Sequence, residues 1–223
     1  RVDGSTHAAL WLFAAFAVAF AIKTPLFPFH TWQPAAYKEA PTTATILLAA
    51  ILSKMGTYGF LRFAIPFFPQ AATVAAPIII ALALFSIVYG ALIAIRQTDI
   101  KRLFAYSSLS HLGFVVLGIF AALLAGENAS IALSGASLQM IAHGLTTAAL
   151  FGIAGMLYQR RSTLALDQLG GIAAVMPRFA SLFWIALFPP IGLHGLCNFA
   201  GEYLILQGTM RSSFCASSLA PTS

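Results

Sequence analysis

The chain has 223 residues, of which 60% are hydrophobic and only 8% are charged. Soluble globular proteins carry about 25% charged residues, so this composition excludes a soluble domain and indicates an integral membrane protein. The net charge of +6 comes from basic residues at the ends of apolar segments rather than from one patch, which argues against nucleic-acid binding. Two cysteines are too few for a disulfide framework.

Six apolar segments predict an all-α, polytopic transmembrane helix bundle. Each has about 20 residues or more, the length that an α-helix needs to cross a bilayer. The third is uncharged throughout, and no charge-rich linker divides the chain. Periodicity and length exclude strands. In chain order, the predicted spans are residues 8–29, 42–63, 74–95, 99–125, 129–158 and 177–206.

Basic residues in the connecting loops predict the orientation. With six alternating crossings, the loops after the first, third and fifth spans lie on one side of the membrane. Cytoplasmic loops carry an excess of lysine and arginine, so we expect the more basic side to be cytoplasmic and residue 1 to lie outside. The first side holds Lys38, Arg96, Lys101, Arg102, Arg160, Arg161 and Arg178, and the other holds Arg1, Arg62 and Arg211.

Proline interrupts the first span at Pro25 and Pro28, and the sixth at Pro189 and Pro190. Proline removes a backbone donor and clashes with the carbonyl four residues earlier. Backbone groups freed at membrane depth must be buried in protein or face water. Discontinuous helices in corresponding positions are typical of transport sites. The alternative is that the prolines only kink packed helices, but a lysine before one break and a glutamate after the other favour a function.

Every predicted span except the third carries an ionisable or imidazole side chain in its interior. These residues are Lys23, Lys54, His111, His143 and Glu202. A charge at the centre of a membrane helix costs at least ~2.5–3.5 kcal/mol. Taken singly, a lysine near a helix end can snorkel to the surface, and a buried histidine can be a satisfied core group. Five such groups on five segments instead predict a polar line through the membrane that moves protons or other ions.

Uncharged polar residues accompany this predicted line. Hydroxyl groups before His111 can support a chain of hydrogen-bonded water, and Gln139 shares a helix face with His143 because it lies four residues earlier. Asp99 is predicted to be only an N-terminal cap, since an aspartate there balances the positive end of the helix dipole. The supporting polar residues are Tyr58, Ser107, Ser110, Gln139, Thr147 and Asn198.

Metal and nucleotide chemistry have no pattern in the sequence. The five histidines are spread over five distant places, and no HExxH or CxxC motif is present. No glycine-rich phosphate loop follows a strand. We therefore expect neither a metal site nor a cofactor site in this chain.

Several runs of the sequence resemble the antiporter-like membrane subunits of respiratory complex I, within the superfamily of proton-conducting membrane transporters. They are 23–32 (KTPLFPFHTW), 39–42 (EAPT), 97–113 (QTDIKRLFAYSSLSHLG), 139–145 (QMIAHGL), 169–171 (LGG) and 198–206 (NFAGEYLIL). The third run is highly specific to that superfamily. The lysine after Ser53 and the glutamate after Gly201 favour the M type, called chain 4 in mitochondria, over the L type. Subunits of multisubunit Na⁺/H⁺ antiporters share much of this core and remain the alternative, together with hydrogenase-linked homologues.

The resemblance implies a role for each ionisable residue. Lys23 matches a lysine on the broken helix that normally pairs with a glutamate on an earlier helix. Lys54 matches a connecting lysine at mid-membrane, and Glu202 matches the terminal acid on the second broken helix. His111 and His143 match the histidines of a central polar axis. Together they imply proton translocation coupled to quinone reduction in an NADH:quinone oxidoreductase.

The resemblance also implies partners and a location. NADH, FMN, iron–sulfur clusters and quinone would be held by partner subunits, so this chain is a non-redox subunit. The implied partners are the other membrane-arm subunits of complex I, especially neighbouring antiporter-like subunits, within a lipid bilayer and without nucleic acid. The implied location is the bacterial plasma (inner) membrane.

Two other functions stay open on the sequence alone. One is a subunit of a sodium/proton or potassium/proton antiporter, which works without redox coupling. The other is a structural membrane scaffold whose charges only bind neighbouring subunits. The scaffold hypothesis predicts that the five ionisable groups face outward, whereas a transport function predicts that they converge inside the bundle.

The sequence also departs from the family pattern. The usual Trp-Leu-Pro-Asp-Ala is WQPAA at 32–36, which loses an acidic residue, and the usual Gly-Leu-Pro-Gly is GLHG at 192–195, which places His194 in the second break. The glutamate that should pair with Lys23 is missing, and the chain starts with Arg1 and shows no signal peptide, so we expect a fragment. We assign residues 1–210 to a partial antiporter-like transmembrane domain and residues 211–223 to a polar tail, disordered or artefactual.

Overall fold

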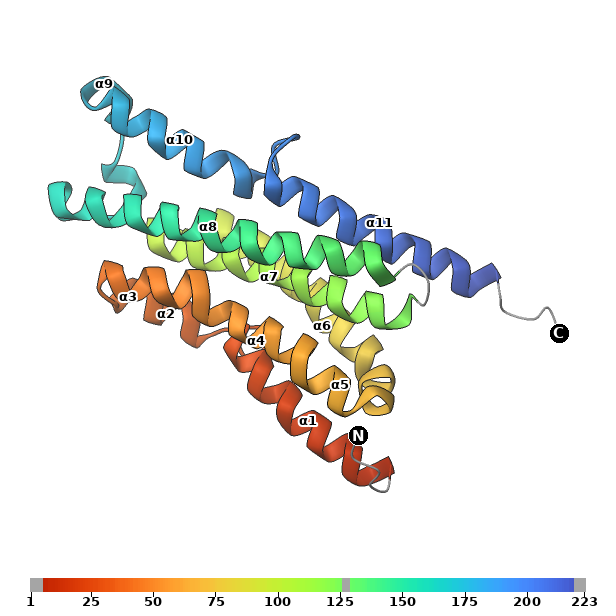
Figure 1. Ribbon diagram of the computed structural model, residues 1–223. Helices are drawn as coiled ribbons and strands as arrows, with labels where there is room; N and C mark the ends of the chain where they lie inside the picture. The colour runs from red at the N-terminus through yellow and green to blue at the C-terminus, as the bar shows by residue number, and fades with distance from the viewer. Residues whose placement is uncertain (1–5, 126–128, 219–223) are drawn as a thin grey trace.

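The chain forms a bundle of roughly aligned helices in the computed structural model, which describes residues 6–125 and 129–218 (Figure 1). Within these ranges there is no strand, only an isolated antiparallel bridge between Asp99 and Ala165. The predicted all-α class is confirmed. The α-helices are α1 Thr6–Lys23, α2 Trp32–Glu39, α3 Thr42–Leu47, α4 Ser53–Gly59, α5 Ile65–Phe67, α6 Pro69–Ile95, α7 Ile100–Leu124, α8 Ala129–Arg161, α9 Ile172–Val175, α10 Pro177–Ile191 and α11 Cys197–Ser218.

Within the described parts of the chain, four helical stretches are long and apolar enough to cross a membrane: Thr42–Phe67, α6, α7 and α8. The first of these is one rod, in which two π-helical stretches, Leu48–Leu52 and Phe60–Ala64, separate α3, α4 and α5. α1 is apolar but shorter. These helices confirm four of the six predicted spans as single rods, while the first and sixth predicted spans are divided.

The first break lies where the prolines predict it, because α1 ends at Lys23 and turns containing Pro25 and Pro28 follow. The turns that follow are held by hydrogen bonds from outside the helix. Ser86 Oγ of α6 accepts from the Phe27 N–H at 2.9 Å, and the Trp32 indole N–H donates to the Ile22 carbonyl at 3.0 Å. The backbone groups that the prolines leave unpaired are thus partly satisfied by side chains.

The second break lies after the prolines rather than at them. Pro189 and Pro190 are both within the last turn of α10, and the helix ends at Ile191. Gly192 and Gly195 then have φ of 81° and 88°, a left-handed conformation that glycine adopts without steric cost. In Figure 1 this loop projects from the bundle between α10 and α11.

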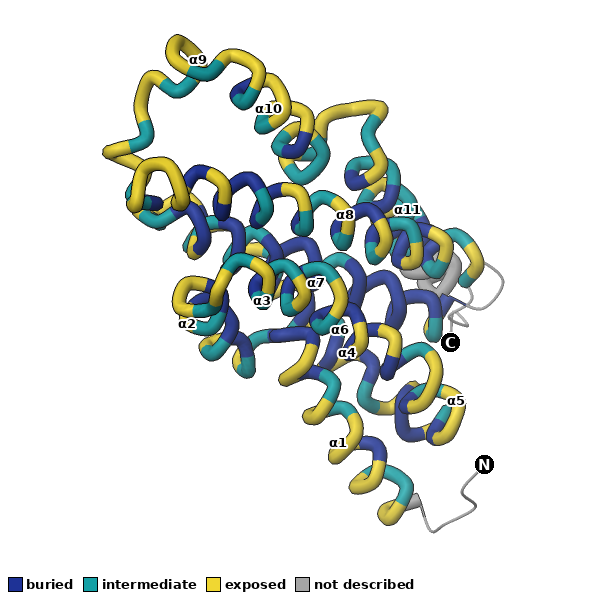
Figure 2. The backbone as a smooth tube through the Cα atoms, turned by 60° about the vertical axis from the view of Figure 1, so that its left-hand side comes forward, coloured by how far each residue is buried: buried dark blue, intermediate teal, exposed yellow. Residues whose placement is uncertain are grey.

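α7 is the central helix of the bundle. In its most apolar stretch 78% of residues are buried, against 22% in α6. Figure 2 shows α7 dark along most of its length, whereas α1 and α10 are largely exposed. Its start is capped as predicted, because the Asp99 carboxylate accepts from the Arg102 backbone N–H at 3.1 Å. The interior of the bundle is therefore built around the helix that carries His111.

Most of the predicted polar tail is helical in the described structure. α11 continues to Ser218, so residues 211–218 of the predicted disordered tail are helical. Residues 219–223 of that tail lie outside the described residues, and so does Arg1, which was counted on the outer side of the membrane.

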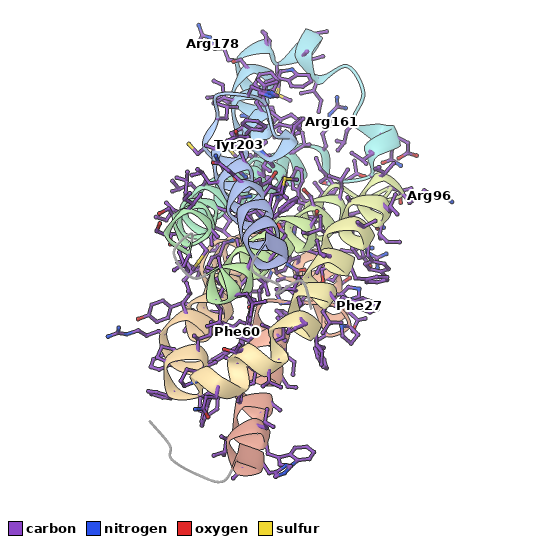
Figure 3. The ribbon with its side chains drawn as sticks, turned by 90° about the vertical axis from the view of Figure 1, so that its right-hand side faces the viewer. Phe27, Phe60, Arg96, Arg161, Arg178 and Tyr203 are labelled. Carbon is purple, nitrogen blue, oxygen red and sulfur yellow. The ribbon has the colours of Figure 1, made fainter. Side chains whose placement is uncertain are left out.

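Basic side chains project from the periphery of the bundle, as Arg96, Arg161 and Arg178 do in the view down its length (Figure 3).

Candidate functional site

A carboxylate and an imidazole from two different helices meet inside the bundle. Glu202 of α11 and His111 of α7 are 2.6 Å apart between Oε1 and Nδ1. Both side chains are largely buried, with exposed fractions of 17% and 11%. When Glu202 is ionised it can only accept, so the imidazole donates across this short contact; when Glu202 is protonated, an unprotonated Nδ1 can accept. The contact allows a proton to pass between α7 and α11.

Gln139 of α8 joins the same carboxylate. Its side-chain amide Nε2 donates to Glu202 Oε1 at 2.9 Å, and the residue is fully buried. Sequence reasoning places Gln139 beside His143, on the shared face of α8. The structure gives its hydrogen bond to α11 instead, because α8 and α11 run antiparallel and Gly201 lies against Gln139.

His143 lies next to His111 and is almost completely buried. Its ring centroid is 5.4 Å from that of His111, and only 1% of the residue is exposed. Neither ring nitrogen has a hydrogen-bond partner among the described residues. A buried polar group without a partner costs about 1–3 kcal/mol, so ordered water between the helices is the expected partner.

Lys54 approaches α8 from the other side. It lies in α4, is 8% exposed, and its Nζ donates to the Ala49 carbonyl at 2.6 Å. Ser53 Oγ donates to the same carbonyl at 2.9 Å. Ala49 belongs to a π-helical stretch, and such stretches are frequent at functional sites. A Cβ placed on Gly144 would be 3.9 Å from Lys54 Cε, so the lysine lies beside the residue that follows His143.

Lys54 also faces an open groove of about 600 Å³ between the Thr42–Phe67 rod and α8. The groove is otherwise apolar. Tyr58 lines it and is 52% exposed, so its hydroxyl is not buried next to the lysine as a supporting group. The groove is lined by Ile46, Leu47, Ala50, Ile51, Lys54, Met55, Tyr58, Met140, Ile141, Gly144, Leu145 and Ala148.

Four of the five predicted ionisable residues therefore gather in one array, Lys54–His143–His111–Glu202. His143 interacts electrostatically with both Lys54 and His111, which links the two ends. Neighbouring unit charges about 4 Å apart interact by about 4 kcal/mol at an effective dielectric of 20. Protonation of one member thus biases the next. The scaffold hypothesis expects these groups to face outward, but the four side chains are largely buried in the bundle.

Lys23 is not part of this array. Its side chain is exposed at the end of α1, and it has no hydrogen bond or ion pair among the described residues. Lys23 is the last residue of α1 and lies on its exposed side, whereas Thr24, Pro25 and Leu26 of the break that follows directly are buried. The predicted single line of five groups is therefore only partly formed within the described chain.

The supporting polar residues differ in whether their side chains are already hydrogen-bonded or still able to bind water. Ser110 Oγ donates to the Ile87 carbonyl of α6, and Thr147 Oγ1 donates to the His143 carbonyl of its own helix. Ser107 is only partly buried. Asn198 is fully buried, and neither atom of its amide has a partner among the described residues. Asn198 is therefore able to bind water near the array, whereas two of the hydroxyls are already occupied.

Ser108, three residues before His111, is one of the hydroxyl groups expected to support a chain of water; it is buried, and its hydroxyl has no partner in the described structure. A second group of buried polar residues, His30, Gln33 and Tyr37, lies at the first break and escaped the sequence prediction. His30 is in the turns before α2, whereas Gln33 and Tyr37 are four residues apart on one face of α2, which is the pattern that could have revealed those two.

His30 in that second group is enclosed by aromatic rings. Its ring centroid is 5.6 Å from that of Phe27, 5.0 Å from Tyr89 and 6.4 Å from Tyr106. Burial lowers the pKa of His30 below its usual value, because the charged imidazolium loses its hydration there. The described residues offer no group of three histidine, cysteine or acidic side chains placed to hold a metal ion.

Comparison with known proteins gives the context for this geometry. Residues 3–222 match the family described as NADH:quinone oxidoreductase/Mrp antiporter, transmembrane. NADH-quinone oxidoreductase subunit M of Rickettsia prowazekii is 46% identical over 197 residues, which cover 88% of this chain and 39% of that protein. This chain therefore spans about two fifths of the length of this relative.

Two solved assemblies contain chains with the same fold. A chain of respiratory complex I from Thermus thermophilus with bound NADH superposes with a TM-score of 0.84 at 39% identity, covering 96% of this chain and 44% of that one. A chain of the Mrp complex from Dietzia sp. DQ12-45-1b superposes with a TM-score of 0.82 over 92% of this chain and 37% of that one. Its 21% identity shows a shared fold alone.

Proposed function

We propose, from the premise that this chain belongs to the NADH:quinone oxidoreductase/Mrp antiporter transmembrane family, that it moves protons as a membrane subunit of an NADH:quinone oxidoreductase. The observation that carries the proposal is the buried array Lys54–His143–His111–Glu202. Groups that titrate and sense one another's charge inside a membrane bundle are what a proton path requires.

In the proposed path, protons pass along the array between Lys54 and Glu202. A proton on His143 repels one on Lys54, and the carboxylate of Glu202 attracts one to His111. Water is needed where direct contacts are missing, and the unpartnered nitrogens of His143 and the amide of Asn198 are the groups able to hold it. Lys23 would join this path through an acidic partner, as the resemblance implies.

The proposal assigns the redox chemistry to other subunits. NADH, FMN, iron–sulfur clusters and quinone would be bound by partners, and this chain would couple quinone reduction to proton transport without a redox group of its own. The proposed partners are membrane-arm subunits, with antiporter-like subunits as neighbours. The proposed location is the bacterial plasma membrane.

The orientation follows from the basic ends of the helices. The C-terminal end of α8, which carries Arg160 and Arg161, lies at the same end of the bundle as α2 and α3 (Figure 1). The positive-inside rule assigns this end to the cytoplasm, and the N-terminus of the chain to the opposite side. A protease-accessible tag placed after Arg161 tests this assignment, because it should be cut only from the cytoplasmic side.

The proposed function is tested by Lys54→Met in the complete complex that carries this chain, reconstituted in vesicles. We expect proton pumping to fall strongly while electron transfer from NADH to an artificial acceptor continues. Thr73→Val is the matched control, since Thr73 is exposed and its hydroxyl bonds only to its own helix. Unchanged pumping in Lys54→Met removes Lys54 from the path.

The second candidate function is a subunit of a multisubunit cation/proton antiporter, because the matched family includes both kinds of protein. It predicts proton flux that depends on Na⁺ or K⁺ in vesicles that contain neither NADH nor quinone. Proton flux that requires NADH oxidation and is indifferent to the cation supports the oxidoreductase instead.

A further inference from the structure

We propose that Gln139 is a positioning residue that keeps Oε1 of Glu202 as a hydrogen-bond acceptor, so that the proton which Glu202 carries resides on Oε2. The inference rests on the proposed function, because it specifies how one member of the proton path works. It assigns to Gln139 a role toward α11 that the sequence does not suggest.

Two groups from different helices converge on one oxygen of Glu202. His111 Nδ1 is 2.6 Å and Gln139 Nε2 is 2.9 Å from Glu202 Oε1. An imidazole donates or accepts according to its protonation, whereas an amide NH₂ only donates. The contact with His111 is therefore possible whether the proton is on the imidazole or on the carboxyl group. In the contact with Gln139, by contrast, the amide is always the donor and Oε1 always the acceptor. Glu202 Oε2 has no hydrogen bond among the described residues.

A permanent donor at Oε1 has a chemical consequence for the protonated carboxyl. A carbonyl oxygen is a better acceptor than a hydroxyl oxygen of the same carboxyl group, so the amide favours C=O at Oε1 and O–H at Oε2. A proton that His111 delivers to Oε1 is moved away from His111 when the carboxyl group rotates about its Cγ–Cδ bond, which returns an unprotonated oxygen to the Gln139 amide and leaves the O–H on the other side, from which the proton is released. Gln139 thereby makes the two oxygens of Glu202 unequal, because Oε1 stays the acceptor that faces His111 and Oε2 carries the proton.

The packing around Gln139 is built for this contact. Gln139 is fully buried, and Gly201 lies directly against it. A Cβ on residue 201 would be 2.7 Å from Gln139 Oε1, closer than real side chains approach, and 3.0 Å from Gln139 Cβ, which is a tight contact. A glycine at 201 therefore lets α11 lie beside the amide without displacing it. The amide does not serve His143, whose ring nitrogens have no partner in the described structure.

The test is infrared difference spectroscopy of the complete complex, with the carbonyl band of protonated Glu202 assigned as the band lost in Glu202→Gln. We expect Gln139→Leu to move that band to higher wavenumber, because its C=O loses one donor, and to lower proton pumping several-fold. Gly201→Ala, which displaces the amide without removing it, should move the band in the same direction. Thr146→Val is the control and should leave both readouts unchanged, since Thr146 bonds to its own helix.

The outcomes separate this inference from the proposed function. A band at the same wavenumber in Gln139→Leu and in the unsubstituted chain overturns the role of Gln139, even where pumping falls. Pumping that survives Glu202→Gln and Lys54→Met overturns the proposed function itself. If Gln139→Leu prevents assembly, Gly201→Ala supplies the same band measurement and decides the question.

Discussion

The two helix breaks of this chain are satisfied in different ways. At the first break, side chains from other positions hold the backbone, with Ser86 accepting from Phe27 and Trp32 donating to Ile22. At the second, two glycines with left-handed φ make the turn, and the loop is exposed. Proline beside an apolar run signals both breaks, but only the first is fixed by tertiary contacts.

The ionisable residues next to the two breaks show the reverse pattern, since the one beside the exposed turn is hydrogen-bonded and the one beside the bonded turn is not. Glu202 follows the exposed glycine turn, yet it is held by His111 and Gln139. Lys23 precedes the tightly bonded break, yet it is exposed. Order in the backbone of a break and completeness of the adjacent ionisable site are therefore separate properties. Substitutions at each break and at each ionisable residue should separate them.

The largest effect is expected from Glu202→Ala. It leaves the Gln139 amide and the His111 imidazole without their acceptor, and each buried unpartnered group costs about 1–3 kcal/mol. We expect a marked fall in the thermal unfolding midpoint of the purified protein in detergent, together with loss of pumping. An unchanged midpoint would contradict the buried, bonded state of Glu202.

A smaller effect is expected from Ser86→Ala, which acts on the first break alone. Ser86 is fully buried, and its loss leaves the Phe27 N–H without an acceptor, at a cost of about 1–3 kcal/mol for a single group. Thermal unfolding in detergent measures it. Ser181→Ala serves as the control, because the Ser181 hydroxyl bonds only to its own helix.

Gly192→Ala probes the second break. Residue 192 has a φ of 81°, and a left-handed conformation costs a residue with a Cβ about 1–2 kcal/mol. No heavy atom lies within 4 Å of the added Cβ, so backbone strain is the only expected term. Equal stability of Gly192→Ala and the unsubstituted chain in thermal unfolding would show that this turn is not left-handed.

The smallest effect on stability is expected from Lys23→Met. The side chain is exposed and bonded to no described residue, so the unfolding midpoint should not change. Proton pumping should fall all the same if Lys23 acts in the path of the complete complex. A large drop in stability would instead show that Lys23 has a structural partner.

Much of the fold follows from the sequence because hydrophobic length is a local property. The runs that form α6, α7 and α8 are predicted within a few residues, and the Asp99 cap is confirmed. The first break falls where Pro25 and Pro28 predict it, since α1 ends at Lys23. The second break is displaced past its prolines, because Pro189 and Pro190 fit within the last turn of α10.

The candidate site is predictable in its residue types but not in its pairings. Lys54, His111, His143 and Glu202 stand out because ionisable groups are costly in a membrane. Which of them touch depends on helix register, and two π-helical stretches in the Thr42–Phe67 rod shift the phase of the side chains beyond them. Gln139 shows the result, because its own helix face suggests His143 and the packing of α11 gives it Glu202.

The carbonyl of Ala49 has a consequence for how Lys54 works. An amine anchored by a neutral oxygen leaves no stranded anion behind when its proton departs, as a carboxylate anchor would. The same tether serves both the ammonium and the free amine, so the side chain need not swing away to discharge. In the proposed path, the protonation of Lys54 is then set by the charge on His143 rather than by a change in its own hydrogen bond.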